Sequence, residues 1–108
     1  MFYCLDIIST HLAVAVAYTD GLGRIWVDPR LTRTERRCAL VHEHRHLAHG
    51  DTCHSEKAER RARRETALIL LPQLPTAHDD LTPHQVAEHY DVTLTVLTDR
   101  LLIERGEL

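Results

Sequence analysis

The segment Thr32–Gly50, TRTERRCALVHEHRHLAHG, predicts the helix around which the rest of the fold is arranged. Thr32 and Glu35 match the S/T-x-x-E capping box, in which each side chain bonds the backbone N–H of the other residue at a helix start. Gly50 is typical of the residue that follows a helix, so we expect this helix to end at about His49.

The motif H-E-x-x-H lies inside this helix, at His42, Glu43 and His46. Residues four apart share a helix face and are separated by about 6 Å of rise, so His42 and His46 can converge on one metal ion. Glu43 projects about 100° around the helix, beside the metal. There it can accept a proton from a metal-bound water without being a ligand.

Before this helix, the sequence predicts a short helix and a β-hairpin. Four apolar residues at helical spacing favour a helix over 2–12: Phe2, Leu5, Ile8 and Leu12. The run AVAVAY at 13–18 and the run Arg24–Asp28 favour two strands joined by a glycine-containing turn at 20–23. We expect the edge of the second strand to hold an extended substrate by strand addition.

After this helix, the sequence predicts three more helices. Ser55 is a suitable N-cap for one that ends at Leu71, a second capping box at 82–85 begins another that ends near residue 90, and the last occupies about 93–104. The predicted fold is α+β: a small β-hairpin or sheet packed on a zincin-like helical core, with a C-terminal helical pair. We expect a single domain over 1–108, with its core at about 13–74 and the pair at about 81–105.

Length and composition favour one cytoplasmic domain. The chain has 108 residues and a formal net charge of −3, which is typical of a single globular domain. Its longest purely apolar run, 12–17, is far shorter than the roughly 20 residues that cross a bilayer, and the first residues lack a signal-peptide pattern. Three cysteines, an odd number, favour a reducing compartment. Nine histidines suggest metal binding or proton transfer.

A catalytic zinc site needs a third protein ligand and an open position for water. The metzincin pattern fails, because its Gly and last His positions are occupied by His49 and Thr52. A gluzincin-like site takes a Glu from the following helix, where three residues qualify: Glu56, Glu59 and Glu65. The spacing leaves all three open.

The segment 59–72, ERRARRETALILLP, resembles the second motif of the ImmA/IrrE-type metallopeptidases. That motif has a Glu, an Ala three residues later, and a Leu-rich turn that closes on Pro. Three further stretches are similar to the same family: IWVDP at 25–29, RRCAL at 36–40, and Gly50-Asp51. The resemblance covers about residues 22–74.

The resemblance implies a zinc-dependent peptidase in which His42, His46 and Glu59 hold Zn²⁺ and Glu43 is the catalytic base. It implies a protein substrate, typically a helix-turn-helix repressor of a phage or prophage, in the cytoplasm of a bacterial host. The alternative is a non-catalytic regulator or antirepressor that binds its target through the same scaffold, with a structural zinc or no metal.

The chain departs from the family pattern at two positions. His44 stands where the family has an apolar residue, and we expect it to face away from the metal. Arg63 stands where the family often has Asp or Asn to support a ligand histidine, so that support must come from elsewhere.

Other readings of the same residues remain open. Cys38 and His49 lie near the same helix face as His42 and His46 and could join a closed structural zinc site, although one ion cannot reach all four. We do not expect direct nucleic-acid binding through 81–104, because its second helix offers few basic residues. Four residues are possible oxyanion donors without a spacing argument for any of them: Arg64, His78, His84 and Tyr90.

Overall fold

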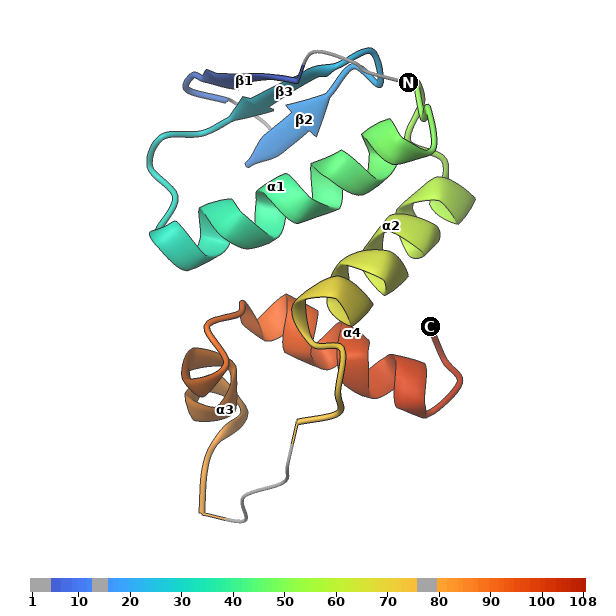
Figure 1. The fold of residues 1–108 in the computed structure, drawn as a ribbon. Helices are drawn as coiled ribbons and strands as arrows, with labels where there is room; N and C mark the ends of the chain where they lie inside the picture. Colours follow the sequence, from blue (N-terminus) through green and yellow to red (C-terminus); the bar gives the residue numbers. More distant parts are fainter. Residues whose placement is uncertain (1–4, 13–15, 76–79) are drawn as a thin grey trace.

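The computed structural model describes residues 5–12, 16–75 and 80–108. These residues form the expected α+β fold, with four helices and a small three-stranded mixed sheet (Figure 1). The elements are β1 (Asp6–Ser9), β2 (Ala17–Thr19), β3 (Arg24–Val27), α1 (Arg33–Ala48), α2 (Glu56–Leu70), α3 (Pro83–His89) and α4 (Leu94–Glu104). In Figure 1 the sheet covers one side of α1, and α2 leads from the end of α1 to the α3–α4 pair. Over the described ranges, no helix is long and apolar enough to span a membrane.

The expected helix over 2–12 is wrong, because Asp6–Ser9 forms strand β1. This strand runs parallel to β3, with Ile7 opposite Ile25 and Ile8 opposite Trp26. The apolar spacing favours a helix here, but the β-branched Ile7 and Ile8 favour a strand. Pairing with β3 then gives the segment its backbone hydrogen bonds. Phe2, which contributed to the expected helix, lies outside the described residues.

The expected hairpin is confirmed in its described part, whereas residues 13–15 of its first strand lie outside that part. Strands β2 and β3 pair antiparallel, with Tyr18 opposite Trp26. In the turn between them, Oδ1 of Asp20 accepts hydrogen bonds from the backbone N–H groups of Leu22 (2.8 Å) and Arg24 (3.2 Å). Gly21 has φ +76°, a left-handed conformation that favours glycine.

The expectation that β3 offers a free edge is wrong. The strand order is β1-β3-β2, so β3 is bonded on both sides and the two edges of the described sheet are β1 and β2. This expectation failed because residues 6–9 were expected to be helical, whereas they form β1 and pair with one edge of β3. One face of the sheet is buried through Thr19, Ile25 and Val27.

Three of the four helices begin at the predicted caps. Thr32 and Glu35 form the capping box of α1, Ser55 caps α2, and Thr82 and Gln85 form the capping box of α3. Each capping side chain accepts a hydrogen bond from a backbone N–H of the first helical turn that has no intrahelical partner. The helix boundaries were therefore predictable to within one or two residues.

The C-terminal pair is joined to α2 by apolar packing and by buried polar contacts. The apolar cluster combines residues from α1, the end of α2 and the pair: Cys38, Leu71, Ala87, Val92, Val96 and Leu97. Arg63 forms a two-point ion pair with the buried Asp99, with Nη2–Oδ1 at 2.6 Å and Nε–Oδ2 at 3.2 Å. Arg100 is also buried and donates from Nε to the Leu71 carbonyl at 2.7 Å. Both arginines thus hold α4 against α2.

Candidate metal centre

His42 and His46 lie one turn apart on α1, as their spacing predicts. Their ring centroids are 5.1 Å apart and the ring planes are inclined by 71°. Because the lone pair of an imidazole nitrogen lies in its ring plane, inclined rings can direct two nitrogens at one point. The helix therefore presents two imidazoles that can share a ligand.

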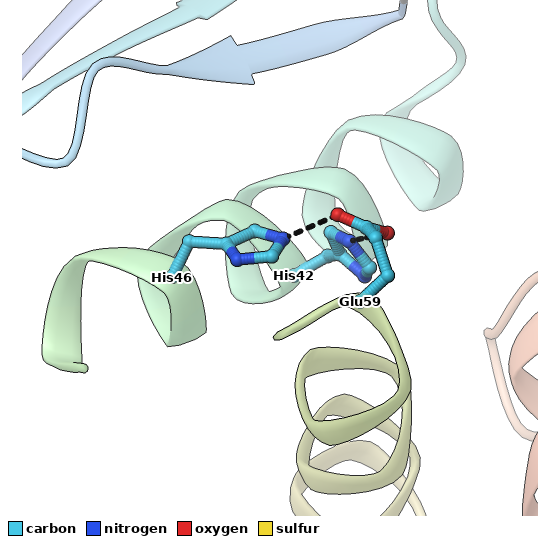
Figure 2. A group of neighbouring side chains, drawn as sticks. All are labelled: His42, His46 and Glu59. Atoms are coloured by element: carbon cyan, nitrogen blue, oxygen red, sulfur yellow. Dashed lines mark hydrogen bonds and ion pairs between the residues drawn. The ribbon is translucent and has the colours of Figure 1, made fainter. Parts of the chain in front are cut away.

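Glu59 comes from the first turn of α2 and faces both histidines (Figure 2). Its Oε2 lies 3.2 Å from Nε2 of His42, and its Oε1 lies 2.7 Å from Nε2 of His46. One ligand atom from each of the three residues lies within 4.8 Å of those of the other two. The structure thus brings together the three residues named as zinc ligands from the sequence.

The other glutamates that qualified as third ligands lie apart from this group. Glu65 accepts from Nε2 of His49 at 2.8 Å and lies 3.7 Å from Nη1 of Arg45. Glu56 is exposed at the start of α2. Neither joins a set of converging ligand atoms among the described residues.

Nδ1 of His46 is held by a carboxylate that is itself held by an arginine. Oδ2 of Asp51 lies 3.0 Å from this nitrogen, and Nη2 of Arg61 lies 2.6 Å and 2.7 Å from the two Asp51 oxygens. The Arg61 hydrogen bond holds the pKa of Asp51 below its ordinary value, so the carboxylate is ionised and can only accept. Asp51 therefore accepts from Nδ1 of His46, and in the neutral ring Nε2 is the nitrogen that presents a lone pair toward Glu59.

The surroundings of the His46 and His42 nitrogens indicate whether a metal ion would fit between these residues and Glu59. Nε2 of His46 is fully buried, and it finds no partner of hydrogen-bond geometry in the described part of the chain although Oε1 of Glu59 is 2.7 Å away. Two lone pairs that face one another at this distance repel unless a proton or a cation lies between them. Burial also lowers the pKa of His42, against the opposing charge of Glu59, and so favours the neutral imidazole that ligates metals. The donor set therefore fits a cation.

Glu43 lies beside this group and does not belong to it. It is 7% exposed, and its Oε2 has no hydrogen-bond partner among the described residues. Burial raises the pKa of Glu43 to about 7, with a further rise from Glu59 and an opposing effect of His46. A carboxyl with this environment can take up and release a proton near neutral pH.

His42 and Glu43 open into a cleft of about 450 Å³ between β2, α1 and α4. Its walls are mainly apolar or hydroxyl-bearing side chains, among them Val16, Ala17, Cys38, Ala39, Thr66, Thr93, Thr95 and Val96. Arg63, in its ion pair with Asp99, also lines the cleft. A cleft with mainly apolar walls and a few polar groups is typical of a ligand or substrate site.

The remaining candidates from the sequence take other positions. His44 contacts Arg45, Nδ1 to Nη2 at 2.9 Å, and lines a separate apolar groove with Leu40 and Ile69, as expected for a residue that faces away from the cluster. Cys38 is buried in the apolar cluster and joins no converging ligand set within the described ranges. The cleft lining includes Arg63 and none of Arg64, His84 and Tyr90, while His78 lies outside the described residues.

Sequence reasoning assigned no role in the proposed catalytic site to three residues at the centre. Asp51 and Arg61 support His46, and His54 stacks on its ring, with centroids 4.4 Å apart and planes inclined by 9°. The available signals were weak: an acidic residue just after the α1 helix, and a histidine just before the Ser55 cap. Their roles depend on the path of the loop between α1 and α2, which no local pattern predicts.

The geometry defines the class of the site, a group of two histidines and a glutamate beside a buried carboxyl. Comparison with known proteins adds no family to this class: no protein-family model, curated protein or solved structure matches the chain.

Proposed function

We propose that this protein is a zinc-dependent peptidase with a zincin-like core, in which His42, His46 and Glu59 hold the metal and Glu43 is the catalytic base. One observation carries the proposal. The carboxylate of Glu59, from a second helix, faces the Nε2 atoms of both motif histidines at 3.2 Å and 2.7 Å. If the motif were only part of a solvated, histidine-rich helix that binds no metal, nothing would require a carboxylate from a second helix to face both histidines.

Two imidazoles and one carboxylate are a common ligand set for catalytic zinc. When bound, Zn²⁺ would acidify a water molecule and polarise a peptide carbonyl. The chain contributes a rigid frame to this chemistry, because the two histidines share α1 and Glu59 lies in the capped first turn of α2. Asp51 adds to the frame by fixing the tautomer of His46.

Glu43 would act by proton transfer. Its buried carboxyl lines the cleft, and its Oε2 has no partner within the described segments to compete for a proton. In the proposed reaction this carboxylate accepts the proton of the attacking water. It then delivers that proton to the leaving amine, so the carboxylate is regenerated as the peptide bond breaks.

The cleft and the neighbouring edge strand support a peptide substrate. Val16 and Ala17, at the start of β2, line the cleft, and β2 is an edge of the described sheet. An extended segment could therefore pair with β2 while its side chains enter the cleft. We propose a regulatory protein as substrate, such as a helix-turn-helix repressor of a phage or prophage in a bacterial cytoplasm, on the strength of the motif resemblance.

Metal analysis tests the ligand set. We expect stoichiometric zinc in the purified protein, lost in Glu59→Ala and retained in the matched variant Glu65→Ala, which lies on the same helix. Retention of zinc in Glu59→Ala would contradict the proposed third ligand.

Cleavage of a quenched fluorescent peptide library tests the reaction. Glu43→Gln should keep the zinc content and the circular dichroism spectrum of the wild type and lose cleavage. Unchanged cleavage in Glu43→Gln would exclude the proposed mechanism. Zinc binding with no cleavage by the wild type would favour the non-catalytic regulator.

A further inference from the structure

His54 lies in the loop between α1 and α2, directly before the Ser55 cap, and it takes part in the centre without belonging to the ligand set. Its Nδ1 is 3.8 Å from Oε1 of Glu59. One of its ring nitrogens lies within 4.8 Å of ligand atoms of both Glu43 and His46. Thus a third imidazole faces the same small region as the proposed base and a proposed ligand.

The stacking of His54 on His46 argues against His54 as a ligand of the same ion. The two rings are nearly parallel, at 9°, with centroids 4.4 Å apart. A zinc ion lies close to the plane of each imidazole that binds it, at about 2 Å from the nitrogen. Two stacked rings occupy separate parallel planes, so one ion cannot lie in both. The 71° angle between His42 and His46, by contrast, allows convergence.

His54 is held on the accessible side of the centre. Its side chain is 27% exposed, whereas that of His46 is 0% exposed. Tyr18 of β2 contacts its ring, with centroids 5.4 Å apart. The stack and the tyrosine fix the ring in place, while its exposure leaves it open to a molecule that enters from solvent.

We propose that His54 is a further catalytic residue, whose ring N–H donates a hydrogen bond to the oxygen of the scissile carbonyl as negative charge develops there. This inference rests on the proposed peptidase function. A histidine ring carries at least one N–H in either protonation state, so the role does not depend on its titration. Ligand atoms of Glu43 and His54 lie within 4.8 Å of one another, so the carbonyl attacked by a water that Glu43 holds would lie within reach of the His54 ring.

The test uses the full chain loaded with zinc and three variants. His54→Ala removes the donor, His54→Gln restores an N–H donor, and His49→Ala is the control, because His49 pairs with Glu65 away from the centre. We expect His54→Ala to lower kcat about 10²- to 10³-fold with little change in KM, the loss typical of one oxyanion donor. His54→Gln should recover part of kcat, and His49→Ala should match the wild type.

A second readout is independent of turnover. Calorimetry with a phosphinate dipeptide, a tetrahedral mimic of the attacked carbonyl, should show affinity that is weakened at least about tenfold in His54→Ala and unchanged in His49→Ala. Loss of zinc from His54→Ala would instead identify His54 as a ligand and overturn the proposal. Wild-type kcat and phosphinate affinity in His54→Ala would also overturn it. Failure of the peptidase function differs from both outcomes, since the wild type itself would then cleave no peptide.

Discussion

Nδ1 of His46 lies 3.0 Å from Oδ2 of Asp51, so a carboxylate outside the group of His42, His46 and Glu59 determines how the His46 ring faces that group. Arg61 holds the same carboxylate from α2. Asp51 and Arg61 thus support His46 from the loop after α1 and from α2, whereas Arg63 binds Asp99.

Asp51→Asn should weaken zinc binding about 10- to 100-fold, because an amide no longer selects the His46 tautomer that presents Nε2 to the metal. A chelator competition titration measures the dissociation constant. Asp91→Asn is the matched control, because Asp91 pairs with Arg37 and is absent from the converging ligand groups. Equal zinc affinity in the two variants would show that Asp51 does not position His46.

Gly21→Ala should destabilise the protein more than Gly106→Ala. Both glycines have positive φ, at +76° and +72°, so alanine is strained by about 1 kcal/mol or more at either position. A Cβ on Gly21 would also lie 2.3 Å from the Asp51 carbonyl oxygen, whereas a Cβ on Gly106 meets no atom within 4 Å. Urea unfolding measures the difference in the free energy of unfolding.

Gly21→Ala should in addition weaken zinc binding, since the backbone it displaces belongs to the residue that supports His46. Gly106→Ala should leave zinc affinity unchanged. If the Gly21 variant loses stability but keeps full zinc affinity, then the contact between this turn and the Asp51 backbone does not affect zinc binding.

Arg63→Ala should lower the free energy of unfolding by about 1–3 kcal/mol, because it leaves the buried Asp99 carboxylate without its partner. The neighbouring Arg64→Ala, at an exposed position of the same helix, should change it by less than about 0.5 kcal/mol. Chemical denaturation of both variants checks this. Equal stabilities would show that the ion pair does not hold α4 against α2.

Asp28 should make stability depend on pH in the acid range. Hydrogen bonds from the Arg30 side chain, and next from its backbone N–H, hold the pKa of Asp28 well below its ordinary value. A carboxyl whose pKa is lowered on folding stabilises the protein above its unfolded pKa of about 3.9, and that contribution is lost as the pH falls toward the folded pKa.

Asp28→Asn should therefore be less stable than the wild type at pH 7, and the gap should close as the pH falls from about 4 to 2. Urea unfolding across this range measures it, with Asp80→Asn at an exposed position as control. A gap that stays constant with pH would mean that Asp28 acts through packing and not through its charge.

The sequence predicted those parts of the molecule that depend on local chemistry. The caps at Thr32, Ser55 and Thr82 are set by residues close by in the chain, and the spacing of His42 and His46 places both on one face of any helix. Glu59 needed more than spacing, because Glu56 and Glu65 lie on the same helix. The motif resemblance selected it.

The remaining features depend on tertiary structure. Strand β1 forms because it can pair with the edge of β3 that β2 does not occupy. The paired residues, such as Asp6 and Arg24, are 18 positions apart in the sequence. Asp51 and His54 reach the centre because the loop after α1 folds back over it, against Gly21 and Tyr18. Patterns of residue spacing carry no information on such a path.

Cys38 lies both in the apolar cluster and in the cleft wall, and it is 5% exposed, whereas Cys53 is exposed. The described part of the chain thus holds two free thiols of opposite accessibility. A small thiol reagent should modify Cys53 at once and Cys38 only when the cleft admits it. The rate at Cys38 divided by the rate at Cys53 therefore reports cleft opening, and a bound peptide should lower this ratio, with no substitution introduced into the chain.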